Sequence, residues 1–321
     1  MWQKIRKSIL GRIQCAERNP IVYNVREYTQ NERIRSYVKT IVAPFEYLRT
    51  VFRRRISVNG REGLAFVLIA KNEAPYIEEW IKFHHKQGVS HFFIYDNESE
   101  DNLREVLMPY IERGLVTYRL LKGRRRQIDA YNKAIHTYGR KFRYMAFLDA
   151  DEFVFVRDES YRDRGFNLYD FVDDFMKSHE NAGGLAVHWL VFGSNGHKTK
   201  PKGGILENYT MSTEKDFENN RFVKTICDPL KVRFFVDDPH YPIYFKFFFN
   251  LDENGEKVQG SVSKKITFDK VRINHYFTKS LEEYILKKNR GKADRDGLRS
   301  MEEFYENDQN VLNDTEILSH R

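Results

Sequence analysis

The pattern of apolar and polar positions alternates between strand-like and helix-like segments from residue 63 onward. Four apolar runs have the length and composition of buried strands: 64–70, 91–97, 115–121 and 144–153. Three segments between them carry apolar residues at helical spacing: 74–88, 101–114 and 126–139. The first of these has Pro75 in its first turn and Gly88 at its end. This alternation predicts an α/β fold, in which a mostly parallel sheet has helices on both faces.

The second half of the chain is less regular. Strand-like runs occupy 183–196, 231–236, 241–251 and 270–277, and helix-like runs occupy 280–291 and 298–308. An Asn-Gly pair within 252–258 predicts a hairpin turn. The first of these strands leads into the Gly-rich sequence FGSNG, which predicts a turn at its end.

Polar side chains follow the predicted strands at the points where those strands end. They are Lys71, Asn72 and Glu73 after the first strand, Asp96 and Asn97 at the end of the second, and Asp149 and Asp151 in the fourth. Ligands of open α/β sheets bind outside the carboxyl ends of the strands. We therefore expect these clusters to line one crevice.

The sequence FLDADEF places Asp149 and Asp151 two positions apart after a buried run. Residues i and i+2 of a strand face the same way, so both carboxylates are expected to point at one ion, with Ala150 on the opposite side. Without a cation they would repel each other and raise each other's pKa. Hard oxygen ligands from few side chains suit Mg²⁺ or Mn²⁺ completed by phosphate oxygens and water. A solvated loop is the alternative for an Asp-X-Asp triplet, and we expect Glu152 to lie behind the site or on the surface.

No glycine-rich phosphate loop follows any predicted strand. We therefore expect phosphates to be held by the metal and by basic side chains. A metal-bridged diphosphate is also a leaving group that Lewis-acid catalysis stabilises, as in the transfer of a sugar from a nucleotide.

Composition narrows the class of protein. The chain has 321 residues, 41% of them hydrophobic and 15% aromatic, which is enough for a sizeable core. Its two cysteines, Cys15 and Cys227, make neither a disulfide framework nor a zinc motif. With no run of about 20 apolar residues and no signal-peptide pattern, the sequence predicts a soluble, cytoplasmic protein.

The net charge of +8 is concentrated at the N-terminus, because residues 1–62 carry 14 Lys/Arg against five Asp/Glu. The remaining residues carry 40 against 41, so the main body is nearly neutral, which argues against a nucleic-acid-binding protein. Within the basic extension, residues 2–13 place isoleucines at helical spacing between lysines and arginines. This pattern suits a helix lying on an anionic surface, such as the inner face of the cell membrane, and equally a helix packed on the body.

Five motifs occur in order along residues 64–310: VLIAKNEAPYIEEWIKFHHKQGVSHFFIYDNESEDN, QIDAYNKAI, FLDADEFV, HWLVFGSNGH and INHYFTKSLEEYILKKNRGKAD. Together they resemble the family-2-like glycosyltransferases grouped with glycosyltransferase family 92. The resemblance implies a GT-A-like (Rossmann-like) domain over 63–310, with 1–62 as a basic, helical extension and 311–321 as a C-terminal tail. It also implies a nucleotide-diphosphate sugar donor, a UDP-sugar by expectation, and a divalent cation, Mn²⁺ or Mg²⁺.

The resemblance assigns roles to residues that match the motifs. His275 would join Asp149 and Asp151 as a metal ligand, with a core histidine as the alternative. For Lys279 and Arg290 the alternative to a diphosphate contact is surface charge. The residues expected to bind the nucleotide sugar are Lys71, Asn72, Glu73, Asp96, Asn97, Gln127, Asn132, Asp149, Lys279 and Arg290. Those expected on the acceptor side are Trp189, Gly193, Ser194, Asn195 and His240.

Transfer with inversion requires a base that deprotonates the acceptor hydroxyl. Glu207, beyond the FGSNG turn, is the first candidate and Asp238 the second. Asp228 departs from the family pattern, which has a basic residue before this proline. The expected acceptor is a glycan or lipid-linked glycan in the synthesis of surface polysaccharides or glycoconjugates. The alternative is a glycan-binding or scaffolding protein without catalysis, which the intact acidic triplet argues against.

Overall fold

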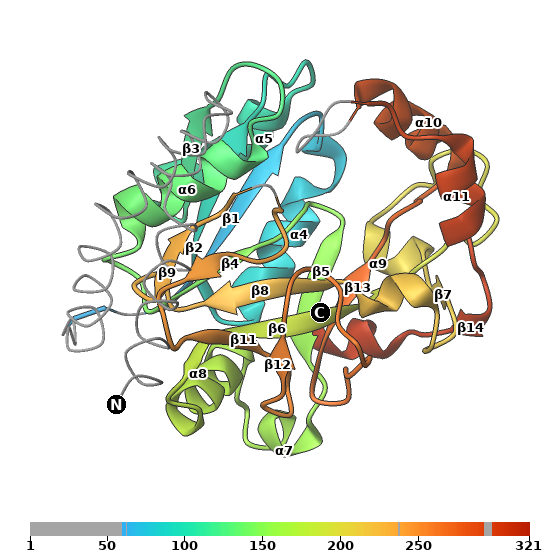
Figure 1. Ribbon diagram of the computed structural model, residues 1–321. Coiled ribbons are helices and arrows are strands. Elements are labelled where there is room, and N and C mark those ends of the chain that lie inside the picture. Colours follow the sequence, from blue (N-terminus) through green and yellow to red (C-terminus); the bar gives the residue numbers. More distant parts are fainter. Residues whose placement is uncertain (1–59, 62, 237, 292–296) are drawn as a thin grey trace, which may run out of the picture.

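The computed structural model describes residues 60–61, 63–236, 238–291 and 297–321 (Figure 1). The expectations for the basic extension 1–62 therefore lie outside the described residues, apart from Gly60 and Arg61. Arg61 pairs with Asp228, 2.7 Å from its Oδ1, on the body of the protein. Among the described residues, no helix combines the length and the apolar character needed to cross a membrane.

One half of the central sheet is parallel, as predicted. Its strands run in the order β3-β2-β1-β4, and every neighbouring pair among them is parallel. Their bounds are Leu64–Ala70 for β1, Val89–Asp96 for β2, Val116–Leu120 for β3 and Tyr144–Phe147 for β4. Each strand is connected to the next by one of the predicted helices, so the carboxyl ends of all four strands meet at the same edge of the sheet.

The other half of the sheet is mixed. Here β8 lies antiparallel between β4 and β6, and β6 is parallel to β11 and β13. Strand β13 pairs antiparallel with β5, and β11 forms the predicted hairpin with β12. The bounds are Glu152–Val156 for β5, Ala182–Val191 for β6, Val223–Cys227 for β8, Phe249–Leu251 for β11, Lys257–Val258 for β12 and Val271–His275 for β13. The predicted α/β architecture is confirmed, and β8, which the sequence pattern did not reveal, joins its two halves.

Helices cover both faces of the sheet (Figure 1). Alternate residues of β1 enter two separate cores. Leu64, Phe66 and Leu68 pack toward α4, α5 and α8. Ala65, Val67 and Ile69 pack toward α6. The bounds are Ala74–Lys86 for α4, Leu103–Glu112 for α5, Gln127–Tyr138 for α6 and Leu168–Ser178 for α8. Since both faces are buried, all seven residues of β1 are buried, as the continuous apolar run predicted.

The structure corrects the predicted strand at 144–153. It is two strands, β4 and β5, which flank a turn where the amide of Glu152 donates to the carbonyl of Asp149 at 3.1 Å. Asp149 and Asp151 therefore lie in a turn, and strand alternation does not orient them. Ala150, expected on the opposite side, lines the same cavity as the two aspartates. The turn arises because β4 pairs with β1 and β8, whereas β5 leaves that layer to pair with β13.

The second half also differs from prediction in detail. The run 241–251 contains two strands, β10 (Ile243–Tyr244), which pairs with β9 (Val232–Phe234), and β11. The predicted C-terminal helices are α10 (Leu281–Arg290) and α11 (Met301–Asn307). Residues 311–321 pack against the body through β14 (Leu312–Asn313) and the buried Ile317. Smaller elements are α7 (Glu159–Arg162), α9 (Ile205–Asn208), β7 (Met211–Ser212) and the 3₁₀ helices Glu218–Arg221 and Glu316–His320.

Two side chains of α4 hold the backbone of β5 immediately after the acidic turn. Trp80 donates its indole N–H to the carbonyl of Glu152 at 2.9 Å. His84 accepts the amide of Val154 at Nε2, 3.1 Å away, and its Nδ1–H donates to the carbonyl of Trp80. Burial lowers the pKa of His84 to about 3, so the ring stays neutral and keeps its lone pair for Val154.

His84 should make the folding of this protein sensitive to acid. The unfolded chain takes up a proton on this residue below its ordinary pKa of 6.5, whereas the folded protein does not, so stability is lost as pH falls toward 3. Each pH unit in that window costs up to about 1.4 kcal/mol. Replacing His84 with Gln removes the titration, so the drop in unfolding free energy between pH 7 and pH 5 should shrink by about 2 kcal/mol. Urea denaturation at the two pH values measures this, and equal drops would contradict it.

Candidate active site

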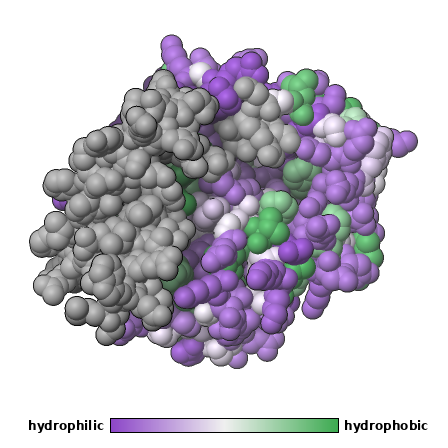
Figure 2. Space-filling view, viewed as in Figure 1, coloured by the Kyte–Doolittle hydropathy of each residue, from purple (hydrophilic) through white to green (hydrophobic). Residues whose placement is uncertain are grey.

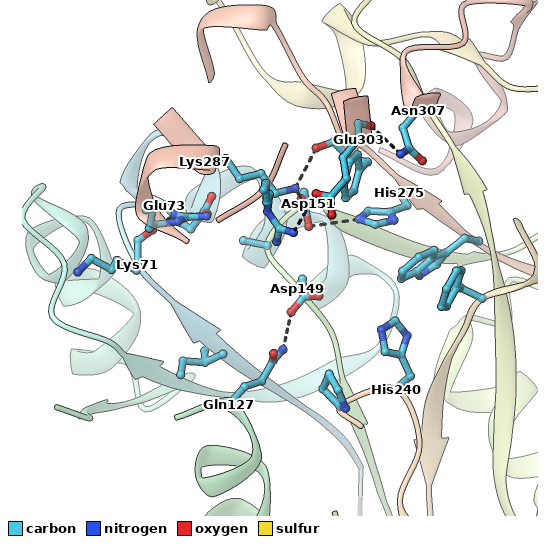
Figure 3. Close-up of a pocket in the computed structure, with 18 of the residues that line it drawn as sticks. Lys71, Glu73, Gln127, Asp149, Asp151, His240, His275, Lys287, Glu303 and Asn307 are labelled. Atoms are coloured by element: carbon cyan, nitrogen blue, oxygen red, sulfur yellow. Dashed lines mark hydrogen bonds and ion pairs between the residues drawn. The ribbon is translucent and has the colours of Figure 1, made fainter. Parts of the chain in front are cut away.

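A cavity of about 400 Å³ opens at the carboxyl ends of the parallel strands (Figure 3). It lies between the ends of β1, β4 and β6 on one side and helices α10 and α11 on the other. On the coloured part of the face in Figure 2, most residues are hydrophilic and the hydrophobic ones lie in separate groups. Ten residues predicted from the sequence line the cavity: Lys71, Glu73, Asn97, Gln127, Asp149, Asp151, Trp189, His240, His275 and Arg290.

Asp149 is held by a buried lysine. The Nζ of Lys224, on β8, lies 2.8 Å from Asp149 Oδ2, and the amide of Gln127 donates to Oδ1 at 3.0 Å. Lys224 is 1% exposed and also lies 3.5 Å from the carboxylate of Glu152. Burial alone would raise the pKa of Asp149, but the charge of Lys224 holds it below its ordinary value. Lys224 therefore keeps Asp149 ionised, and together with Gln127 it fixes the orientation of the carboxylate.

Glu152 lies behind this pair, fully buried. Its Oε2 accepts the amide of Asp149 at 2.8 Å, and its Oε1 has no hydrogen-bond partner. Burial raises the pKa of Glu152 to about 8, against the opposing charge of Lys224. Glu152 thus supports the acidic turn from the side of the core. Of its two predicted positions, behind the site or on the surface, the structure shows the first.

Asp151 is paired with a second lysine, which lines the cavity. The Nζ of Lys287, on α10, lies 2.7 Å from Asp151 Oδ2 and donates to the carbonyl of Phe277 at 2.9 Å. Burial opposes ionisation of Asp151, but Lys287 and the more distant Lys279 hold its pKa well below the ordinary range. His275 Nε2 lies 3.8 Å from Asp151 Oδ1. Figure 3 shows Asp151, His275 and Lys287 converging on one part of the cavity.

The donor set suits a divalent cation, although no group of three acidic, histidine or cysteine ligands among the described residues is already arranged around one point. Carboxylate oxygens and a neutral imidazole are ligands that Mn²⁺ accepts. Burial lowers the pKa of His275 to about 3, so this ring is neutral, and its buried Nδ1 has no partner. The residues fit such an ion once the ammonium of Lys287 leaves Asp151.

The first strand end carries an ion-pair cluster. Glu73 lies 2.8 Å from Arg290 and 3.6 Å from Lys279, measured between carboxylate oxygens and the cationic nitrogens. Arg290 also donates to the backbone carbonyl of Lys71. Lys279 lies beside the cavity without lining it. With Lys287, these cations form a positive rim over the acidic turn, which favours an anionic ligand.

An aromatic wall faces the acidic turn. Trp189 on β6 stacks on Phe222 with ring centroids 5.2 Å apart and contacts the rings of His240 and His275 at 5.2 and 4.1 Å. Its buried Nε1 has no partner. His240 Nδ1 lies 3.0 Å from the carbonyl of Val223, and burial lowers the pKa of His240 to about 4. The wall therefore presents neutral rings to the cavity.

Three nucleotide-side predictions have other partners in the structure. Asn132 makes both amide hydrogen bonds with the backbone of Phe235. Asp96 accepts the hydroxyl of Tyr118 at 2.6 Å and the amide of Ser99 at 2.8 Å. Asn72, at φ 56°, bonds the strand-end loop at Ser99 and Glu100. None of the three lines the cavity.

The acceptor-side turn and both predicted bases also lie outside the cavity walls. The FGSNG turn packs on residues 308–310: the amides of Ser194 and Asn195 donate to Asp308 and Asn310, and a Cβ at Gly193 would meet Asn310. Glu207 caps α9 at the amide of Gly204 and pairs with Arg321 at 3.3 Å. Asp238 accepts the amide of His240 at 2.8 Å. Asp228, the departure from the family pattern, pairs with Arg61 away from the cavity.

Several cavity residues were not predicted from the sequence. Lys287 lies inside the quoted INHYFTKSLEEYILKKNRGKAD motif, so its motif was recognised but its role was not. Lys224, which does not line the cavity but holds Asp149, was not predicted either, because it belongs to β8, whose short run FVKTIC gave no clear strand pattern. The remaining unpredicted polar or charged cavity residues are Asn219, Arg299, Glu303, Glu306 and Asn307.

The family model for glycosyltransferase family 92 matches residues 68–311, which include both strand-end clusters, the acidic turn and α10. The chain belongs to glycosyltransferase family 92. A family 92 protein of Ricinus communis is 29% identical over 142 residues, covering 44% of this chain and 24% of that protein. One of Oryza sativa subsp. japonica is 28% identical over 141 residues, covering 44% and 23%. The match thus spans about a quarter of these relatives.

Solved structures with partial likeness to this family 92 chain include S. aureus TarS 1–349 in complex with UDP-GlcNAc. It has a TM-score of 0.40 and 14% identity, over 76% of this chain and 64% of that one. Another is glucosyl-3-phosphoglycerate synthase from Mycobacterium tuberculosis in complex with Mn²⁺, UDP and glucosyl-3-phosphoglycerate. It has a TM-score of 0.26 and 17% identity, over 40% and 44% of the two chains.

Replacing Lys224 with Met should destabilise the fold strongly. The change leaves Asp149 and Glu152 buried without their cation, which typically costs about 3–5 kcal/mol. Urea denaturation measures it, with Lys215→Met as control because Lys215 is exposed and should change stability by no more than about 0.5 kcal/mol. Adding Asp149→Asn to the Lys224→Met protein should recover part of the loss. A loss below about 1 kcal/mol would show that the pair does not support the turn.

Proposed function

We propose that this protein transfers a sugar, with inversion, from a nucleotide-diphosphate sugar to a glycan hydroxyl and that the reaction depends on a divalent cation. The observation that carries the proposal is the acidic turn, Asp149 and Asp151, in one cavity with Lys287 and Arg290 of the positive rim, with Lys279 beside it. A pair of carboxylates beside a cluster of cations suits a ligand that brings both a metal ion and phosphate oxygens. The family supplies the class of reaction.

The donor is expected to lie along the carboxyl ends of β1, β2 and β4. Its nucleoside, uridine by expectation, would occupy the side with Lys71, Glu73 and Asn97, which line the cavity at the first two strand ends. Its diphosphate would meet the positive rim. This order leaves the sugar facing the aromatic wall, where Trp189 offers its ring.

Asp149, Asp151 and His275 would hold the cation, Mn²⁺ or Mg²⁺, and a bound ion would stabilise the negative charge that develops on the leaving diphosphate. Lys224 keeps Asp149 ionised and oriented, and Gln127 fixes its other oxygen. Lys287 and Arg290 can donate hydrogen bonds to the same phosphates. The acidic turn thus binds the metal and diphosphate while the surrounding lysines set its charge.

The acceptor base is better sought on α11 than at either predicted position. Of the described residues, five carboxylates line the cavity: Glu73, Asp149, Asp151, Glu303 and Glu306. The first is ion-paired with Arg290, and the two aspartates are the proposed ligands. Glu303 accepts the hydroxyl of Tyr284 at 3.4 Å, makes a longer ion pair with Arg299 at 3.9 Å, and lies near Asp151 and His275 in Figure 3. We assign the base to Glu303, in place of Glu207 or Asp238.

A glycan or lipid-linked glycan is the proposed acceptor, because the aromatic wall and the polar side chains of α11 together suit a carbohydrate. Docking of residues 1–62 on an anionic membrane surface stays a prediction from the sequence. It would bring the protein close to a lipid-linked acceptor.

Asp151→Asn should abolish metal-dependent binding of UDP while the protein remains folded. The amide keeps the shape of the side chain but removes a charged ligand, and affinity should fall by at least about 100-fold. Titration calorimetry with UDP and Mn²⁺ measures it. The control is Asp129→Asn on α6, whose half-exposed carboxylate pairs with Arg126 away from the cavity. Unchanged affinity in Asp151→Asn would remove the acidic turn from the donor site.

Glu303→Gln should keep UDP and Mn²⁺ affinity but slow sugar transfer by about 10²–10⁴-fold, because an amide cannot take the acceptor's proton. Glu207→Gln should transfer at nearly the normal rate, since Glu207 lies outside the cavity walls. Single-turnover kinetics with an accepted donor and acceptor separates the chemical step from binding. Loss of transfer in Glu207→Gln alone would return the base to the position that the sequence suggested.

A further inference from the structure

The two lysines that neutralise the acidic turn differ in their surroundings. Lys224 sits in the middle of the sheet on β8, is 1% exposed, does not line the cavity and contacts both Asp149 and Glu152. Lys287 comes from α10, lines the cavity and contacts Asp151. An ion entering the cavity can therefore compete directly with Lys287, whereas Lys224 is buried behind Asp149.

We propose that Lys287 is an exchangeable counter-ion: it neutralises Asp151 until metal and diphosphate bind, and then moves from Asp151 to the diphosphate. The inference rests on the proposed function and adds to it which anion Lys287 pairs with before and after the ligands bind. Lys287 Nζ lies 2.7 Å from Asp151 Oδ2, within the space that a cation on that oxygen would occupy. A divalent ion and an ammonium cannot share that position, because like charges repel strongly at contact distance. Binding of the metal therefore requires Lys287 to leave.

Lys287 can leave without unfolding α10. The helix is anchored at its N-terminus by a capping box between Ser280 and Glu283, and Glu283 also accepts the hydroxyls of Tyr76 and Tyr209 at 2.6 Å. Lys287 lies one turn beyond this anchor, with its ammonium 4.4 Å from the ring of Phe277. Its flexible four-carbon stem lets the ammonium swing while the helix stays in place.

The exchange couples the two ligands. Metal alone must break the ion pair of Lys287 with Asp151 without supplying a new anion in exchange, which weakens metal binding. Metal together with a diphosphate gives Lys287 a new anionic partner, so the displacement costs less. Because coupling between sites is reciprocal, the diphosphate should tighten the metal by the same factor as the metal tightens the diphosphate. A free Asp151 would lack the part of this coupling that the movement of Lys287 supplies.

The test compares the full-length protein with Lys287→Met, which keeps the length of the stem and removes the charge. Titration of Mn²⁺ without nucleotide, followed by the electron paramagnetic resonance signal of free Mn²⁺, should show at least about tenfold tighter binding in the variant. Titration of UDP at saturating Mn²⁺ should show at least about tenfold weaker binding, because the phosphates lose a charged donor. Lys288→Met, a neighbour that does not line the cavity, should behave as wild type in both. Thermal denaturation confirms that each variant is folded.

Three outcomes would contradict the inference in different ways. If wild type binds UDP only with Mn²⁺, but Lys287→Met binds Mn²⁺ alone no more tightly than wild type does, the exchange is wrong and the proposed function stands. If neither protein binds Mn²⁺, even with UDP present, metal dependence fails and the exchange fails with it. Tighter Mn²⁺ with unchanged UDP affinity would show that Lys287 leaves Asp151 but does not reach the diphosphate, which contradicts the second half of the proposal.

Discussion

The ammonium of Lys224 lies 2.8 Å from Asp149 and 3.5 Å from Glu152 in the interior of the sheet. Three acidic residues within four positions could not be buried there without a cation, since desolvation and mutual repulsion would both oppose their ionisation. The position of β8 between β4 and β6 brings this lysine to the turn. Strand β8 therefore has two roles. It joins the two halves of the sheet, and its Lys224 supplies the positive charge that stabilises the acidic turn at the floor of the cavity.

The acidic turn is also held by backbone contacts from both sides. Trp80 and His84 of α4 fix β5 just after it, and the amide of Tyr276 on the far side donates to the carbonyl of Asp151 at 2.8 Å. This places Asp151 next to His275 at the end of β13. A site whose ligands come from a turn needs such support, because a turn by itself orients side chains poorly. Helix α4 and strands β5 and β13 supply this support.

The cavity has walls of opposite character. Carboxylates and lysines gather at the strand ends and on α10, whereas Trp189, Phe222 and His240 form an uncharged wall facing them. A charged nucleotide and an uncharged glycan would each find complementary surroundings in this arrangement. The helix α11 closes the remaining side with Glu303, Glu306 and Asn307, which share one face of the helix because they are three and four residues apart.

The amino-acid sequence was enough to predict the alternation of strands and helices, the meeting of polar clusters at the carboxyl ends of β1 and β4, and the family. These follow from local periodicity and from ordered motifs, which need no knowledge of distant contacts. Contacts between distant segments were needed to learn that 144–153 breaks into two strands and that Lys224 and Lys287 neutralise the aspartates. The same holds for Glu207, which lies outside the cavity walls, and for Glu303, which lines them. Lys224 is 75 residues from Asp149 in sequence and Lys287 is 136 from Asp151. Each aspartate is thus neutralised by a lysine that is far away in the sequence. The local sequence does not indicate which distant lysine will lie beside it in the folded protein.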